Sequence, residues 1–222
     1  MATQTLNYID AIAHIPAGGT LILNEVSWDE YEQLLADLGD SAGVRVSYDQ
    51  GRLEIMSPSS KHEKYALLIT LLVFTAAEEL DVVIEGAGTT TYKQKWLAKG
   101  VEPDGCFYVS NAGAIIGKEQ IDLKTDPPPD IVVEIDISRE STRKLAIYAG
   151  MGVPEVWRYD GKRTHIYQLV GQDYVEVDAS LILPVFNTSV LERFLDQGKT
   201  DGQTATKRAF REWLRASKPF GL

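Results

Sequence analysis

Cysteine and histidine are scarce in this sequence of 222 residues. The single cysteine, Cys106, cannot form a disulfide within the chain, which excludes a disulfide-stabilised scaffold and favours a reducing compartment. The three histidines stand far apart and no H-E-x-x-H pattern occurs, so the sequence predicts no zinc hydrolase. A G-K-S/T phosphate loop is also missing, which argues against a nucleotide-dependent enzyme.

Long apolar segments are missing as well. The longest, at residues 66–77, is much shorter than the roughly 20 residues that a membrane-spanning helix needs. The first ten residues lack the basic and then apolar pattern of a secretory signal. We therefore expect a soluble protein in the cytoplasm, with no membrane partner.

Positive charge is in short supply. The chain has 22 lysine and arginine residues against 32 aspartate and glutamate residues, a net charge of −10. Such a charge repels phosphate backbones and counts against nucleic-acid binding. Four cations near the carboxyl end recur at helical spacing, which is typical of a solvated helix face and would also suit a phosphate-contacting stripe. These are Arg208, Arg211, Arg215 and Lys218.

The hydrophobic pattern predicts an α/β fold, with a mixed central sheet flanked by helices. A long helix should follow the polar turn at 57–60 and end near Leu80, and it should be buried because it is apolar almost all round. The segment 130–137 is typical of a strand in the middle of a sheet. The other predicted strands are 19–26, 44–48, 52–56, 82–86, 89–94, 101–109, 154–159, 164–169 and 173–177. The other predicted helices are one that begins after a capping box of Ser27 and Glu30, and 139–149, 188–197 and 204–217.

We expect residues 1–222 to form a single domain. A small sheet-and-helix extension at 15–56 precedes a core at 57–178, and helices at 185–218 complete the chain.

Acidic residues occur at regular positions on two predicted strands. Alternation of side chains along a strand puts Glu102 and Asp104 on one face, and it puts Asp130, Glu134 and Asp136 together on another. Burying unpaired charge is costly, and carboxylate oxygens are the ligands that Mg²⁺ or Mn²⁺ prefers. The pattern therefore predicts either a divalent-metal site shared by two strands or a rim of exposed acids at strand ends.

These residues resemble the motif of the PD-(D/E)xK nuclease superfamily, with Pro103-Asp104 followed some 30 residues later by Glu134-Ile135-Asp136. Three longer segments are similar to the Uma-two-type family of restriction-endonuclease-like bacterial proteins. They read PDIVVEI at 129–135, KLAIYA at 144–149 and GVPEVW at 152–157. The resemblance covers roughly residues 15–215 and implies a restriction-endonuclease-like fold with a nuclease-like core.

What the resemblance implies is a metal-dependent phosphodiesterase. Asp104 and Glu134, with the carbonyl of Ile135, would hold Mg²⁺ or Mn²⁺. A lysine normally stands two residues after the glutamate, and here that position holds Asp136. Either Asp136 is an additional ligand or Lys144, at the start of the next helix, takes the place of the lysine. A third interpretation makes Lys144 an ordinary helix-surface residue.

The start of the long helix offers further candidates. The superfamily often adds an acid from this helix, which would be Glu63. The spacing of Ser60 and Glu63 also fits a capping box, which would give Glu63 a structural role. Lys61 and His62 are predicted neighbours of a phosphate.

The resemblance implies a DNA endonuclease that acts as a homodimer, so that two sites cut two strands. Asp136 and the acidic surface favour an alternative, a catalytically degenerate nuclease fold that serves as a binding or scaffold protein. A third hypothesis is a metal-dependent hydrolase of a small phosphodiester, for which a net charge of −10 matters less.

Overall fold

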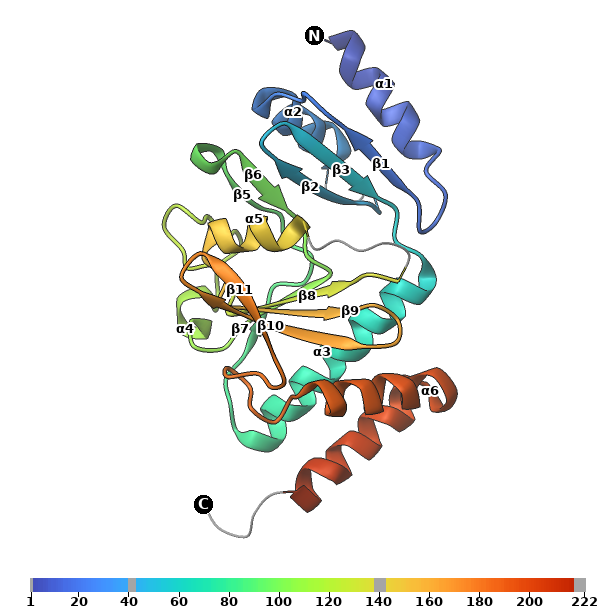
Figure 1. Cartoon of the computed structure of the whole chain (residues 1–222), viewed down its shortest axis with the longest axis vertical. Helices are drawn as coiled ribbons and strands as arrows, with labels where there is room; N and C mark the ends of the chain where they lie inside the picture. The colour runs from blue at the N-terminus through green and yellow to red at the C-terminus, as the bar shows by residue number, and fades with distance from the viewer. Residues whose placement is uncertain (1, 40–42, 138–142, 218–222) are drawn as a thin grey trace.

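The computed structural model describes residues 2–39, 43–137 and 143–217, which form two sheets with helices around them (Figure 1). A five-stranded antiparallel sheet has the order β1-β3-β2-β6-β5, and a six-stranded mixed sheet has the order β11-β10-β9-β8-β7-β4. The first sheet consists of β1 (Thr20–Leu23), β2 (Arg45–Asp49), β3 (Arg52–Met56), β5 (Tyr92–Gln94) and β6 (Lys99–Val101). The second consists of β4 (Glu85–Gly86), β7 (Gly105–Tyr108), β8 (Ile131–Ile135), β9 (Glu155–Tyr159), β10 (Thr164–Val170) and β11 (Asp173–Val177).

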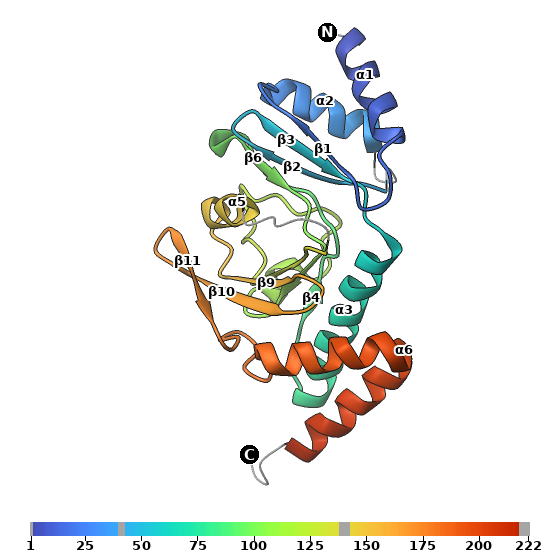
Figure 2. The ribbon, with the colours of Figure 1, turned by 45° about the vertical axis from the view of Figure 1, so that its right-hand side comes forward.

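The helices cover the sheets on several sides (Figures 1 and 2). Buried side chains of α3 (Ser60–Leu80) and α6 (Thr188–Ser217) pack on one face of the six-stranded sheet. Those of α5 (Arg143–Met151) pack on its other face, together with β5 and β6. The five-stranded sheet packs against α1 (Ala2–Ala13) and α2 (Trp28–Leu38). The short elements are α4 (Ala112–Ile115) and the 3₁₀ turn η2 (Lys95–Leu97).

Strand β8 lies in the interior of the six-stranded sheet, and all five of its residues are buried. Side chains alternate across a strand, so Ile131, Val133 and Ile135 pack toward α3 and α6 while Val132 packs toward α5. Glu134 therefore lies on the α5 side. The β-branched sequence of β8 thus holds an acid between the sheet and a helix.

The structure confirms the α/β fold and several local predictions. Ser27 and Glu30 form the expected capping box at the start of α2. The hairpin of β2 and β3 turns at Gln50-Gly51, where Gly51 has a φ of 92°. The chain from Thr188 to Ser217 is broken at Gly202 (φ 77°), which corresponds to the two predicted helices. None of the helices in the described ranges is long and apolar enough to cross a membrane.

Other predictions need correction. The predicted strand at 101–109 is divided at Pro103 into β6 and β7, which belong to different sheets, because proline has no N–H to donate to a ladder. The sequence did not reveal α1. The predicted helix start at 139 falls at 138–142, outside the described residues, and α5 is described from Arg143.

Candidate active site

Asp104 directly precedes β7, and Glu134 lies in the neighbouring antiparallel strand β8. Gly105 is paired with Val133, and the N–H of Asp104 donates to the Val133 carbonyl at 3.1 Å. Continued by one residue, this register puts Asp104 opposite Glu134, and directly opposite residues of an antiparallel pair share a face.

Asp104 is buried among donors from three elements. Its Oδ2 accepts the N–H of Ile135 at 2.8 Å and lies 3.0 Å from His62 Nε2, while Arg45 Nε is 3.7 Å from Oδ1. Burial alone would raise the pKa of Asp104. The contact with His62, the charge of Lys144 and the Ile135 N–H outweigh burial, and the pKa lies below its ordinary value.

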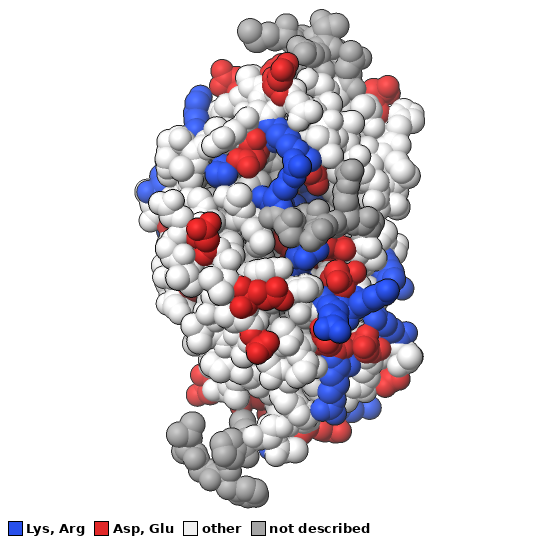
Figure 3. All heavy atoms as spheres, viewed as in Figure 1, with Lys and Arg blue, Asp and Glu red and all other residues white. Residues whose placement is uncertain are grey.

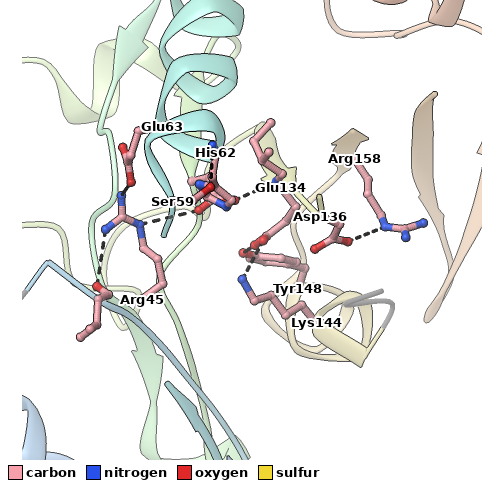
Figure 4. A network of polar contacts seen from close by, with 12 residues as sticks. Arg45, Ser59, His62, Glu63, Glu134, Asp136, Lys144, Tyr148 and Arg158 are labelled. Carbon is pink, nitrogen blue, oxygen red and sulfur yellow. Dashed lines mark hydrogen bonds and ion pairs between the residues drawn. The ribbon is translucent and has the colours of Figure 1, made fainter. Parts of the chain in front are cut away.

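Glu134 contacts two side chains of α5 (Figure 4). Lys144 Nζ lies 2.7 Å from its Oε2, and the Tyr148 hydroxyl donates to its Oε1. Burial raises the pKa of Glu134 to about 7, and the charge of Asp104 adds to this, although Lys144 acts in the opposite direction. Burial would lower the pKa of Lys144, but Glu134 and Asp104 raise it overall, which keeps its ammonium group charged.

The start of α3 supplies His62 and Glu63 (Figure 4). Ser59, not Ser60, caps the helix, and it accepts the N–H of His62 at 3.3 Å. The capping-box interpretation of Glu63 is therefore wrong, and Glu63 instead forms an ion pair of 2.9 Å with Arg45 of β2. Burial lowers the pKa of His62, but the contact with Asp104 raises it above the ordinary value.

Asp136, at the position where the resembled superfamily has its lysine, is paired with an arginine. Arg158 Nε of β9 lies 2.5 Å from Asp136 Oδ2. Both side chains are nearly buried, and Figure 4 shows them beside Glu134. Asp136 thus adds negative charge to this part of the sheet, and Arg158 offsets it.

A small cavity of about 30 Å³ lies next to these residues. Space of this size accommodates a water molecule or a metal ion. Its wall includes Arg45, His62, Glu134, Ile135, Asp136 and Lys144. Among the described residues, no group of three or more histidine, cysteine, aspartate or glutamate side chains is arranged to hold a metal ion. A site made of Asp104, Glu134 and the Ile135 carbonyl remains a prediction.

Two other predicted acids have structural contacts. Glu102 accepts the N–H of Val46 at 2.8 Å, which fixes it to the five-stranded sheet and separates it from Asp104. Asp130 accepts the N–H groups of Val109 and Asn111, at 2.7 and 3.0 Å, and the Asn111 side-chain amide at 2.8 Å. Both acids position the backbone.

Two residues of the site were missed by the sequence analysis. Tyr148 could have been found, because it follows Lys144 by four residues and so shares its helix face. Arg45 gave no signal, since it reaches Asp104 from a strand of the other sheet.

The carboxyl-terminal cations are partly used within the fold. Arg211 contacts Glu78 at 2.6 Å, and Arg215 contacts Glu79 at 2.8 Å, so both join α6 to α3. Lys218 lies outside the described residues. These pairs explain two of the four cations without a phosphate.

Comparisons with known proteins identify the family and the fold of this chain. Residues 28–198 match the Uma2 family, which is described as "Putative restriction endonuclease". The chain belongs to this family. No curated protein matches it.

A similar solved structure is that of "a putative nuclease belonging to DUF820" from Anabaena variabilis. The match has a TM-score of 0.54 and 13% identity, and it covers 77% of this chain and 99% of that chain. At this identity the likeness establishes the fold alone, which the two proteins share.

Proposed function

We propose that this protein is a divalent-metal-dependent endonuclease that hydrolyses phosphodiester bonds in DNA. The observation that carries the proposal is the contact of 2.7 Å between Lys144 Nζ and Glu134 Oε2, on the face that also holds Asp104. In this proposal Lys144 takes the role of the motif lysine, whose position in the sequence is occupied by Asp136. Lys144 supplies the positive charge that phosphodiester chemistry requires beside the acids. Family membership supports the reaction class.

The residues present fit a divalent cation. Asp104 Oδ1 is buried without a hydrogen-bond partner among the described residues, and the cavity beside Glu134 has room for an ion. Burial, together with the charge of Asp104, raises the pKa of Glu134, and an additional cation would favour its charged form. Asp104 and Glu134, with the carbonyl of Ile135, would hold Mg²⁺ or Mn²⁺. When bound, the ion would make a water more acidic and offset charge on the scissile phosphate.

The side chains around the acids have distinct proposed tasks. Lys144 keeps its charge in the site, so it can orient the attacking water and neutralise a phosphate oxygen. Tyr148 fixes the direction of the Glu134 carboxylate through its hydroxyl. Arg45 and His62 lie on the Asp104 side, where they can approach the substrate phosphate, and Glu63 holds Arg45 in place.

A plasmid-nicking assay in Mg²⁺ or Mn²⁺ tests the proposal. We expect the native chain to nick the plasmid and Glu134→Gln to lose about 100-fold or more of the rate. Glu155→Gln is the matched control, since Glu155 is equally buried but bonds to Trp157 and the Leu181 N–H. Equal nicking by the native chain and by Glu134→Gln would point to a contaminant and contradict the proposal.

A second candidate function, a nuclease fold that binds without cutting, is favoured by one observation. Both oxygens of Glu134 already have partners, in Lys144 and Tyr148. This candidate predicts no nicking and no Mn²⁺ binding. The hydrolase of a small phosphodiester, the third hypothesis, predicts cleavage of a chromogenic phosphodiester while the plasmid stays intact.

The proposed homodimer would place two sites on the two strands of a duplex. Light scattering of the protein with and without duplex DNA measures the oligomeric state. We expect a mass of two chains, about twice 24.6 kDa, when the duplex is bound. A mass of one chain on the duplex would contradict the dimer and leave the proposed chemistry untouched.

A further inference from the structure

A large groove lies between α3 and the break in α6, outside the cavity at Glu134. Its volume is about 720 Å³. The two helices lie side by side in both ribbon views (Figures 1 and 2). The groove is lined by Lys61, Lys64, Tyr65, Leu68, Gly198, Lys199, Thr200, Gly202 and Gln203.

The shape of the groove is fixed by close packing. A Cβ at Gly198 would overlap with the side chain of Leu68, so the absence of a side chain lets α6 approach α3. Gly202, with a φ of 77°, breaks the helix. Gln203 Nε2 then donates to the Lys64 carbonyl at 3.1 Å and ties the two helices together.

The charge of the groove is opposite to that of the chain. Its described lining has three lysines and no acidic residue, although the chain carries a net charge of −10. Lys61 and Lys64 are exposed and form no ion pair with another described residue. Lys199 is paired with Asp196 at 2.5 Å. Figure 3 shows lysine and arginine side chains gathered at the lower right, over α6, with acidic side chains among them.

The groove and the candidate active site meet at the start of α3, where Lys61 lines the groove and His62 lines the cavity at Glu134. Lys61 directly precedes His62 and Glu63, which contact Asp104 and Arg45. Lys64 lies three residues after Lys61, so the two lysines are neighbours on one face of the helix. A strand bound at the cavity beside Glu134 would therefore lie close to these lysines.

We infer that this groove binds the phosphate backbone of the DNA that flanks the cleavage position. The inference rests on the proposed function, since it takes the same substrate and adds the surface that holds it. Exposed lysines that have no ion-pair partner in the described part of the chain, here Lys61 and Lys64, are groups that contact phosphates without reading sequence. Binding should accordingly depend strongly on salt and little on sequence.

Fluorescence anisotropy with a labelled DNA duplex, measured in EDTA over a series of salt concentrations, tests the inference without cleavage. We expect Lys61→Ala and Lys64→Ala each to weaken binding about eightfold at 0.1 M salt. Each should also reduce the slope of log affinity against log salt by about 1. Lys124→Ala is the matched control, because Lys124 is exposed and lies outside the groove lining. It should bind like the native chain.

The outcomes separate this inference from the proposed function. If Lys61→Ala and Lys64→Ala keep the native affinity and the native salt slope, the inference that DNA binds in the groove is wrong, whether or not the protein cuts DNA. An equal loss of DNA affinity in Lys124→Ala would also contradict the inference, because the loss would then reflect the net charge of the protein. Preference for an RNA duplex of the same sequence would contradict DNA as the occupant. The expected losses without any nicking would support the groove and count against the endonuclease.

Discussion

Two buried acids with different surroundings lie at strand β8. Asp130, just before the strand, and Glu134, within it, are each 3% exposed. Asp130 is bonded to three N–H donors of Val109 and Asn111, all neutral and two of them backbone groups. Glu134 faces an ammonium group, a phenol and a second carboxylate. Burial alone therefore does not distinguish the two acids, whereas the charge of their neighbours does.

The largest expected effect is the difference in cleavage rate between variants of the proposed metal ligands and a variant of Asp130. Asp104→Asn and Glu134→Gln should each reduce metal-dependent nicking by about 100-fold or more, because each removes a proposed ligand. Asp130→Asn should keep the cleavage rate per folded molecule but lose about 2–3 kcal/mol of stability, since three bonds to a charged acceptor are weakened. Nicking rates and urea unfolding measure the two effects. Loss of cleavage in folded Asp130→Asn would contradict the purely structural role given to Asp130.

A second difference of similar size is expected between two lysines that form similar ion pairs. Lys144 and Lys99 each lie 2.7 Å from a carboxylate, and their side chains are 12% and 13% exposed. Lys144→Ala should reduce nicking about 10²- to 10³-fold, since it removes charge stabilisation at the phosphate. Lys99→Ala should cut like the native chain. Equal rates in the two variants would remove Lys144 from the mechanism.

The pH dependence of the free energy of unfolding tests the surroundings of Glu134. The pKa of Glu134 is raised from 4.5 to about 7 in the folded chain, so the folded state retains the proton that the unfolded state loses. This group's contribution to stability is therefore present below pH 4.5 and decreases as pH rises to 7, by about 3 kcal/mol. Urea unfolding in EDTA should show this decrease in the native chain relative to Glu134→Gln. A constant difference between the two across this range would contradict the raised pKa.

The smallest effect is expected at Tyr148. Tyr148→Phe leaves Glu134 without its phenolic donor, and we expect about a tenfold lower nicking rate. Tyr48→Phe is the control. Tyr48 lies in β2 of the five-stranded sheet, and its hydroxyl is also buried but donates to the Val26 carbonyl. This variant should affect stability and not the rate. A native rate in Tyr148→Phe would show that the phenol does not position Glu134.

Local features of the fold could be predicted because they depend on residues close in sequence. The capping box of Ser27 and Glu30 and the hairpin at Gln50-Gly51 are set within four positions. The alternation along β8 likewise places Glu134 opposite the core residues Val133 and Ile135. These predictions required no knowledge of the partner strands.

Long-range pairing could not be predicted in the same way. Strand β6 extends the amino-terminal sheet by pairing with β2, some 50 residues earlier, and β5 pairs with β6 at the edge of the sheet. Nothing in their short sequences specifies this pairing. The change of sheet at Pro103 separates Glu102 from Asp104, although strand alternation alone puts them together. The contact of Arg45 with Asp104 depends on this packing and was missed for that reason.

The candidate site was partly predictable. Asp104, Glu134 and Lys144 were chosen from motif resemblance, and the fold brings them together because β7, β8 and α5 are adjacent. Asp136 and Glu63 contact Arg158 and Arg45. These ion pairs join distant segments, so spacing could not reveal them. The tasks of all five residues in cleavage remain predictions.

Calorimetric titration of the metal-free protein with Mn²⁺ tests the central claim most directly, because it asks whether Asp104 and Glu134 hold a cation together. We predict saturable binding at the paired acids in the native chain and in the Glu155→Gln control. We predict its loss in both Asp104→Asn and Glu134→Gln. Native-like Mn²⁺ binding by either of these two variants, or no binding by the native chain, would contradict the claim.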